Sequence, residues 1–101
     1  MTYRVTITQT KTEFTPEGVD FFNPSDNYKT FFQSWIDSGH MTEIQNTING
    51  DGTQKVSIVE FTSEIKHNEF INEVQDSDCA SLRNDYNETN KISYNRIVEV
   101  V

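Results

Sequence analysis

The chain has 101 residues, of which 34% are hydrophobic and 12% aromatic, and its formal net charge is −8. This length suits one α+β domain over residues 1–101. The acidic charge disfavours direct binding to nucleic acid or to an anionic membrane through a basic patch, and no apolar run is long enough to span a bilayer.

The first predicted element is a strand at the N-terminus. Apolar residues occupy every second position from Tyr3 to Ile7, which is the pattern of a half-buried strand. The next segment, residues 11–23, contains a Pro-Glu-Gly turn flanked by aromatic residues. We predict a hairpin or loop there, the hairpin having short strands at 11–14 and 19–22.

The aromatic residues of this segment are Phe14, Phe21 and Phe22, and they raise the question of what covers them. Burying one Phe stabilises a protein by about 1.5–3 kcal/mol, so an exposed group of them is unfavourable. Either the segment folds back as a lid over the helices, or it meets a second subunit or a partner. Phe14, Phe21 and Phe22 are therefore candidate interaction residues.

The clearest helix pattern spans residues 24–38. Asn23 is a suitable N-cap residue, and Pro24 suits the first helical position. A continuous apolar stripe follows at helical spacing, formed by Tyr28, Phe31, Phe32, Trp35 and Ile36. We expect this stripe to face the core.

Two strands are predicted at residues 41–48 and 55–62, joined by the Asn-Gly-Asp-Gly turn at 49–52. Apolar residues occupy both faces of the second strand. Either a β-bulge near Ile58–Val59 or cover on both faces would account for this pattern, and both explanations place the strand centrally in the sheet.

The second crossover begins with a helix capped by Thr62 or Ser63. After an interruption, a turn or short helix is expected to bring Cys79, Leu82 and Tyr86 together. A final alternating strand then runs from residue 92 to the end of the chain.

This second crossover is also strongly acidic. Glu69, Glu73 and Asp76 fall at i, i+4 and i+7, which places them on one helix face as an acidic ridge. A solvated surface is the simplest interpretation. The functional alternatives are a docking surface for a basic protein partner, or mimicry of a nucleic acid by an acidic inhibitor. Glu69, Glu73 and Asp76 are therefore the second set of candidate interaction residues.

The element order predicts an α+β fold of the ferredoxin-like βαββαβ type, with a four-stranded antiparallel sheet, two helices on one face and the other face bare. This arrangement resembles the dimeric α+β barrel group, in which two such sheets pack their bare faces together. The resemblance implies a homodimer. It also implies a cavity between sheet and helices, as in the cofactor-independent monooxygenases of that group, with Trp35 and neighbouring rings lining the pocket.

Catalytic, cofactor-binding and metal-binding motifs are not found in the sequence. His67 shares a helix face with Glu64, but a structural zinc site needs four ligands. Cys79 lies beside Asp76 and Asp78, whose negative charges would raise the pKa of its thiol. These residues therefore indicate a structural role.

A single cysteine favours a reducing compartment, and the N-terminus lacks the basic and long apolar regions of a signal peptide, so we expect a cytoplasmic protein. Our main prediction is a non-enzymatic interaction domain that forms a homodimer and docks a basic partner, without cofactor or metal. The alternatives are an enzyme or small-molecule binder of the dimeric barrel type, and an acidic nucleic-acid mimic.

Overall fold

The computed structural model of the chain describes residues 2–76 and 79–101, and the side chains of all of these except residues 75 and 76. The elements in chain order are β1 (Tyr3–Lys11), α1 (Asp26–Asp37), β2 (Met41–Ile48), β3 (Gln54–Phe61), α2 (Glu64–Asp76), α3 (Cys79–Thr89) and β4 (Ile92–Val100). In this described part, the four strands form one antiparallel sheet in the order β2-β3-β1-β4. The predicted α+β class and four-stranded antiparallel sheet are confirmed.

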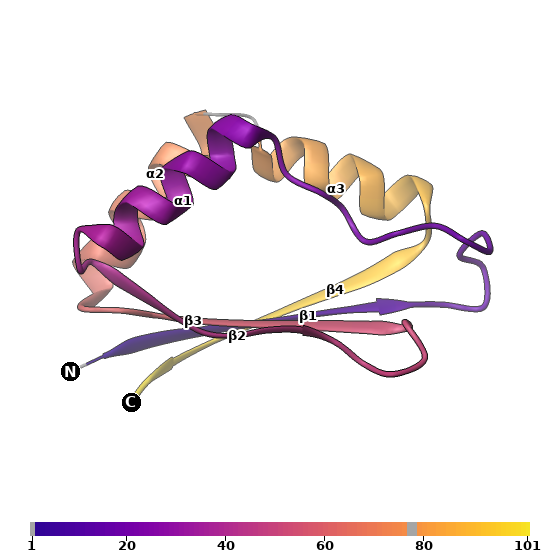
Figure 1. Cartoon of the computed structure of the whole chain (residues 1–101), viewed down its shortest axis with the longest axis horizontal. Coiled ribbons are helices and arrows are strands. Elements are labelled where there is room, and N and C mark those ends of the chain that lie inside the picture. Colours follow the sequence, from indigo (N-terminus) through magenta and orange to yellow (C-terminus); the bar gives the residue numbers. More distant parts are fainter. Residues whose placement is uncertain (1, 77–78) are drawn as a thin grey trace.

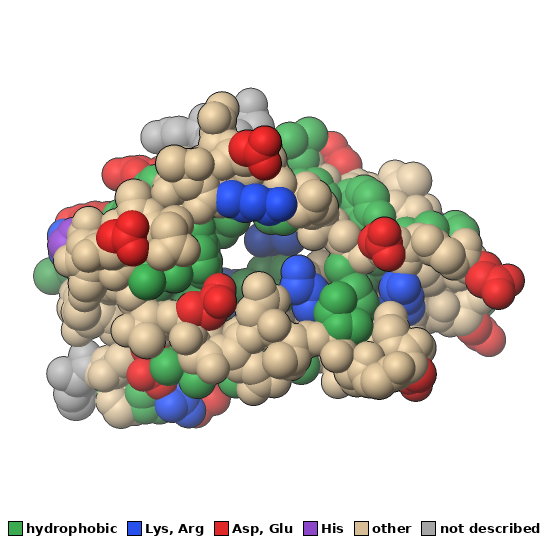
Figure 2. Space-filling model, viewed as in Figure 1, with side chains coloured by type: hydrophobic (Ala, Val, Ile, Leu, Met, Phe, Trp, Pro, Cys, Tyr) green, Lys and Arg blue, Asp and Glu red, His purple; other side chains and the backbone are tan. Residues whose placement is uncertain are grey.

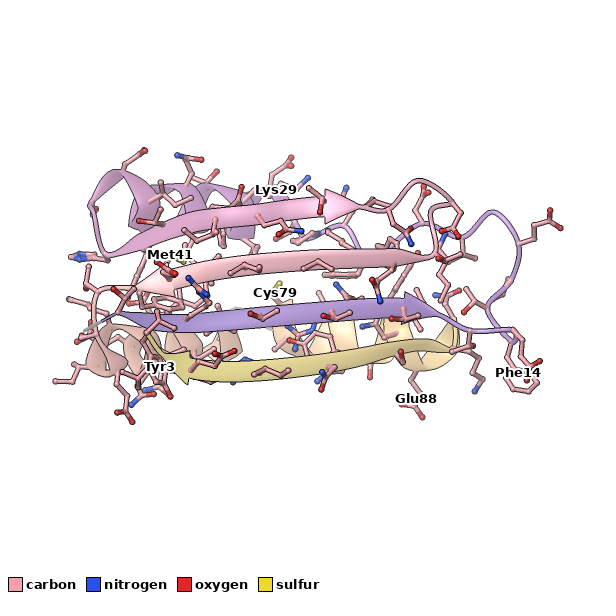
Figure 3. All side chains as sticks on the ribbon, turned by 90° about the horizontal axis from the view of Figure 1, so that it is seen from below. Tyr3, Phe14, Lys29, Met41, Cys79 and Glu88 are labelled. Atoms are coloured by element: carbon pink, nitrogen blue, oxygen red, sulfur yellow. The ribbon has the colours of Figure 1, made fainter. Side chains whose placement is uncertain are left out.

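The three helices of the described residues lie on one face of the sheet and form an arch over it (Figure 1). α1 and α2 rise away from one end of the sheet, and α3 slopes back towards the other end. α1 lies over the β2 side, whereas α2 and α3 lie over the β4 side (Figure 3). The arch meets the sheet closely at one end and stands off it in the middle.

The apolar core lies at the end of the sheet where α1 and α2 converge. Phe61 and Met41 are its most deeply buried large side chains. Phe70 of α2 stacks on Phe31 of α1 with 5.3 Å between ring centroids, and its ring also meets that of Trp35. The apolar stripe predicted for the first helix therefore packs into the core.

Both of the first two helices begin at serine caps. The hydroxyl of Ser25 accepts a hydrogen bond from the backbone nitrogen of Tyr28 at 3.3 Å, so the N-cap of α1 is Ser25 and not the predicted Asn23. The hydroxyl of Ser63 accepts one from the backbone nitrogen of Lys66 at 3.2 Å. Each cap satisfies a backbone donor that the helix itself cannot pair.

Strand β3 occupies a central position, as predicted, but for a different reason. It keeps an unbroken alternation, with Val59 and Phe61 facing the helices and Ile58 facing the other side. The irregularity in the sheet lies in β2, between Glu43 and Gln45. The irregularity thus lies opposite Val59 and Ile58 but in the neighbouring strand, so it does not bring the apolar residues of β3 to one side as the predicted bulge would, and β3 presents apolar residues on both faces.

Of the segment 11–23, Lys11 ends β1 and residues 12–23 form a loop, so the hairpin strands predicted within the segment are absent from the described structure. Two threonine hydroxyls tie this loop to the start of β4. Those of Thr12 and Thr15 donate to the backbone carbonyl of Lys91 at 2.7 and 2.9 Å. The loop is thus fixed at the far end of the sheet from the apolar core.

The second crossover contains two helices where one helix and a turn or short helix were predicted. α3 is a full helix of 11 residues. Cys79 is buried at its start and Tyr86 is half-buried, but Leu82 is 56% exposed. The predicted grouping of Cys79, Leu82 and Tyr86 is therefore wrong at Leu82, because a different face of α3 turns towards the sheet.

The sheet face opposite the helices is not covered by any other element of the described chain (Figure 3). Threonine and other polar side chains predominate on it. A cross-strand row of Ile58, Thr6 and Ile97 crosses its middle, and Ile97 is 48% exposed. This uncovered face is called the open face below.

Candidate functional site

A cavity of about 680 Å³, called the helix–sheet cavity below, lies beneath the arch of helices. All four strands, all three described helices and the loop before α1 contribute to its lining. Its opening is visible in the centre of the space-filling view, with basic side chains around it (Figure 2). The volume is within the usual range for small-molecule sites.

One part of the lining is apolar and continuous with the core. It includes the aliphatic and aromatic side chains of Val5, Ile7, Phe22, Phe32, Val59 and Phe70. These groups would provide an apolar surface for the body of a ligand.

The sheet beneath the cavity changes character along its length. Successive cross-strand rows on the helix-facing side are Val59–Val5–Val98, then Ser57–Ile7–Arg96, then Lys55–Gln9–Tyr94. The side chains therefore change from purely aliphatic to mainly polar within two rows. Since these residues all face the interior side of the sheet, the change creates a polar end of the helix–sheet cavity.

Helix α3 faces this polar end with polar side chains of its own. The guanidinium of Arg83 lies over the ring of Tyr94, 4.4 Å from its centroid. The buried amide of Asn87 donates a hydrogen bond to the side-chain oxygen of Gln9 at 3.0 Å. Cys79 and Ala80 at the start of α3 pack in the core, and the inward face becomes polar from Arg83 to Asn87, whereas the apolar Leu82 is exposed.

The charges around the cavity are mainly positive. The basic residues that line it are Lys29, Lys55, Arg83 and Arg96, and the acidic one is Glu43. The ion pairs of the described chain lie elsewhere and join Arg4 to Glu60 and Lys66 to Glu69. Within the described residues, the four cavity cations therefore have no carboxylate in ion-pair contact.

Burial changes the proton affinity of two groups at the cavity. Burial lowers the pKa of Lys55, with Glu43 opposing this shift and Lys29 adding to it. Burial raises the pKa of the Tyr28 hydroxyl, and the positive charge of Arg83 partly opposes that shift. Both shifts reflect a site from which water is partly excluded.

Arg96 is held in place at the edge of the cavity by His67. The guanidinium contacts Nε2 of His67, while Nδ1 lies 3.0 Å from the side-chain oxygen of Asn68. A neutral imidazole with its proton on Nδ1 fits both contacts, because Nε2 then accepts from the guanidinium. Burial lowers the pKa of His67, and Arg96 adds to this effect. The imidazole is packed edge-on to the rings of Tyr3 and Phe61.

The aromatic residues predicted as an interaction surface have three different environments. Phe14 is 73% exposed at the loop tip, far from the core (Figure 3). Phe21 is only 8% exposed, with the ammonium of Lys11 lying 5.2 Å from its ring centroid. Phe22 packs against Tyr86 and lines the cavity. The loop therefore folds back at Phe21 and Phe22, and the interaction role of all three stays a prediction.

The acidic ridge lies away from the cavity. Glu69 and Glu73 are exposed on α2, and Glu69 forms an ion pair with Lys66 at 3.1 Å. The side chain of Asp76 lies outside the described residues. Trp35, predicted to line a pocket, packs instead against the rings of the core.

The cavity cations were missed in the sequence, although two of them have a recognisable pattern. Lys55 stands at the same strand parity as Phe61, and Arg96 at the same parity as Val98. The alternation of each strand therefore placed both cations on the apolar side of the sheet. Lys29 and Arg83 lie on helices and have no comparable signal.

Comparison of the chain with protein-family models, curated proteins and solved structures found no match. Among the described residues, no cluster of His, Cys, Asp and Glu side chains could hold a metal ion. None of the helices in the described chain has the length and apolar content needed to cross a membrane.

Proposed function

We propose that this protein binds a small organic molecule in the helix–sheet cavity. The observation that carries this proposal is the polar row Lys55–Gln9–Tyr94 on the helix-facing side of the sheet, beneath a cavity of about 680 Å³. Apolar lining with a few convergent polar groups is the usual composition of a small-molecule site.

Polar side chains facing the interior of the domain lower the stability of the fold. Protein interiors are normally close-packed, and polar groups turned towards them cost free energy unless they are paired. Within the described chain, Nε of Arg83 and Oδ1 of Asn87 are buried without a hydrogen-bond partner. Such costs at one end of a small domain are typical of a site shaped for binding.

The environments of His67 and Cys79, the side chains best suited to catalysis, favour binding without catalysis. Both ring nitrogens of His67 are engaged, and its imidazole is packed against Tyr3 and Phe61. Burial raises the pKa of the Cys79 thiol, which reduces the thiolate needed for nucleophilic attack. We therefore propose a binding protein and not an enzyme.

The binding proposal is tested with the neutral dye N-phenyl-1-naphthylamine, whose fluorescence rises in apolar surroundings. Ser57→Phe places a ring in the cavity, whereas Ser93→Phe places the same ring on the open face. We expect the wild type and Ser93→Phe to bind the dye equally, and Ser57→Phe to bind at least about tenfold more weakly. Circular dichroism checks that each variant is folded. Equal binding by Ser57→Phe would reject the proposal, as would a folded wild type that binds neither this dye nor an anionic analogue of it.

We further propose that the fold is ferredoxin-like and that two copies pair through their open faces, as in the dimeric α+β barrel group. The strand order β2-β3-β1-β4 and the placing of all helices on one face support this proposal. The exposed Ile97 on the open face would be buried by a second copy.

Sedimentation velocity tests this pairing. Ile97→Lys should convert a dimer into a monomer, because a charge would be buried in the contact. The matched control is Ile48→Lys, whose target is 55% exposed but lies beside the second, smaller hollow and not on the open face. A wild-type chain that stays monomeric at every concentration would contradict the proposal.

A further inference from the structure

We infer that the ligand of the helix–sheet cavity is an organic anion, with its negative group held by the cavity cations and its apolar body against the aromatic lining. This inference rests on the proposed binding function and adds the chemical class of the ligand. Three observations on the cavity cations Lys29, Lys55, Arg83 and Arg96 carry it: their convergence on the cavity, their lack of carboxylate partners among the described residues, and the orientation of the two arginines.

The cations converge on the cavity from four separate elements. Lys29 comes from α1 and Lys55 from β3, on the side of the sheet where β2 forms the edge (Figure 3). Arg83 comes from α3 and Arg96 from the opposite edge strand, β4. Since these segments are distant in sequence, the fold itself brings the positive charges to one cavity.

The overall charge of the chain makes this grouping unexpected. Acidic residues outnumber basic ones by 16 to 8, yet half of all the basic residues line this one cavity, where Glu43 is the lining carboxylate among the described side chains. A solvated acidic protein would more simply pair its cations with its many carboxylates. In a partly dry cavity the unpaired cations instead produce a positive potential that favours an anion.

The two arginines are already oriented for such a ligand. Arg83 is stacked on Tyr94, and its buried Nε has no hydrogen-bond partner within the described chain. Arg96 is held by His67. A planar guanidinium fixed in this way matches the geometry of a carboxylate, sulfonate or phosphate group.

The apolar lining defines the remainder of the ligand. Phe22 and Phe32 line the same cavity as the cations, and Tyr94 is at once the stacking partner of Arg83 and part of the wall. A flat ring system carrying one anionic group would use both kinds of surface. An inorganic anion alone would leave the apolar lining unused.

A matched pair of dyes tests this inference. 8-Anilinonaphthalene-1-sulfonate has the same ring system as N-phenyl-1-naphthylamine but carries one negative charge. We expect the sulfonate to bind the wild type about tenfold or more tightly than the neutral dye, which is the effect of one charge-assisted hydrogen bond. This preference should shrink as salt is added, because salt screens the cavity charges.

Three variants locate the effect. Lys29→Gln and Lys55→Gln should each weaken sulfonate binding by about threefold to tenfold and change binding of the neutral dye by less than about twofold. Lys29 is exposed, so its replacement leaves the packing intact. Sulfonate binding by Lys29→Gln therefore tests the inference even if Lys55→Gln does not fold. Lys91→Gln, an exposed lysine outside the cavity, is the control and should change neither dye.

The outcomes separate this inference from the proposed function. Equal binding of the two dyes, or unchanged sulfonate binding in Lys29→Gln and Lys55→Gln, would contradict the inference that the ligand is an anion. Neither result would contradict the proposed binding function. Binding of neither dye by the folded wild type would overturn both.

Discussion

The helix-covered face of the sheet has two ends that are built differently. At one end Met41, Phe61 and Tyr3 lie in a row beneath α1 and α2. At the other end Lys55, Gln9 and Tyr94 lie in a row beneath α3 and the loop. The same strands run through both ends, so the change in residue type, and not a change in secondary structure, separates a packed core from a cavity.

The helices follow this division. At the apolar end Phe70 packs among Phe31, Trp35 and Phe61, so aromatic rings fill the space between the two helices and the sheet. At the polar end α3 contributes Arg83, whose charged group cannot close onto an aliphatic surface. Folding free energy is therefore concentrated at the first end, and the second end is left as a cavity.

The largest expected effect comes from truncating one ring at each end. Phe61→Ala should lower the free energy of unfolding by about 3–5 kcal/mol, because it leaves a cavity in a close-packed core. Phe22→Ala should cost about 1–2 kcal/mol, since Phe22 is half-buried and already borders open space. Urea unfolding of both variants measures the difference. Equal losses would mean that the two ends share one uniformly packed core.

The apolar end is also the part of the fold that the sequence predicts well. The stripe from Tyr28 to Ile36 repeats at helical spacing, and the alternation from Tyr3 to Ile7 is the repeat of a strand. Both patterns arise from burial on one side of a single element. Elements whose packing is decided locally in this way were therefore placed correctly.

The cavity depends on information that no single segment carries. Arg83 lies at the position of α3 that faces Tyr94, but the sequence suggested Leu82 for the inward face because it is apolar. An apolar residue was assumed to be buried, and this assumption fails where the interior itself is polar. A cavity between sheet and helices was expected only from the resemblance to the dimeric α+β barrel group. The one signal for its cations within the sequence, the strand parity of Lys55 and Arg96, was missed.

A smaller effect is expected from pH, through His67 at the junction of the two ends. Its pKa is lowered by burial and by Arg96, so the unfolded chain takes up a proton near the ordinary value of about 6.5 while the folded chain does not. The unfolded state then binds more protons, and stability falls as the pH drops below that value. We expect the melting temperature of the wild type to fall more steeply than that of His67→Gln between about pH 7 and pH 5.

The measurement compares how steeply the melting temperature changes with pH in the wild type and in His67→Gln. Absolute melting temperatures are not compared, because the substitution also alters packing against Tyr3 and Phe61. Carboxylates that titrate in the same range contribute to both slopes and cancel in the comparison. Parallel curves would show that His67 is not held neutral in the folded protein.

Replacing a cavity cation by an apolar side chain should raise the stability of the protein, and this gain should be smaller than the losses predicted above. Lys55 is half-buried without a carboxylate in ion-pair contact among the described residues. Lys55→Met keeps a side chain of similar length but removes the cost of burying a charge. We therefore expect the free energy of unfolding, measured in urea, to rise by about 0.5–1 kcal/mol. The same variant should bind the anionic dye more weakly. A loss of stability would show that the lysine supports the fold.

The smallest effect is expected at the tip of the loop, where Phe14 is 73% exposed. Phe14→Ser should change the free energy of unfolding by less than about 0.5 kcal/mol, because the side chain has little contact to lose. Phe21→Ser should cost clearly more, since Phe21 is buried beneath Lys11. Sedimentation of Phe14→Ser adds a second readout, because lost self-association with unchanged stability would assign Phe14 to a subunit contact. If association and stability are both unchanged, the loop contributes to the protomer through the buried Phe21 and through Phe22, which lines the helix–sheet cavity.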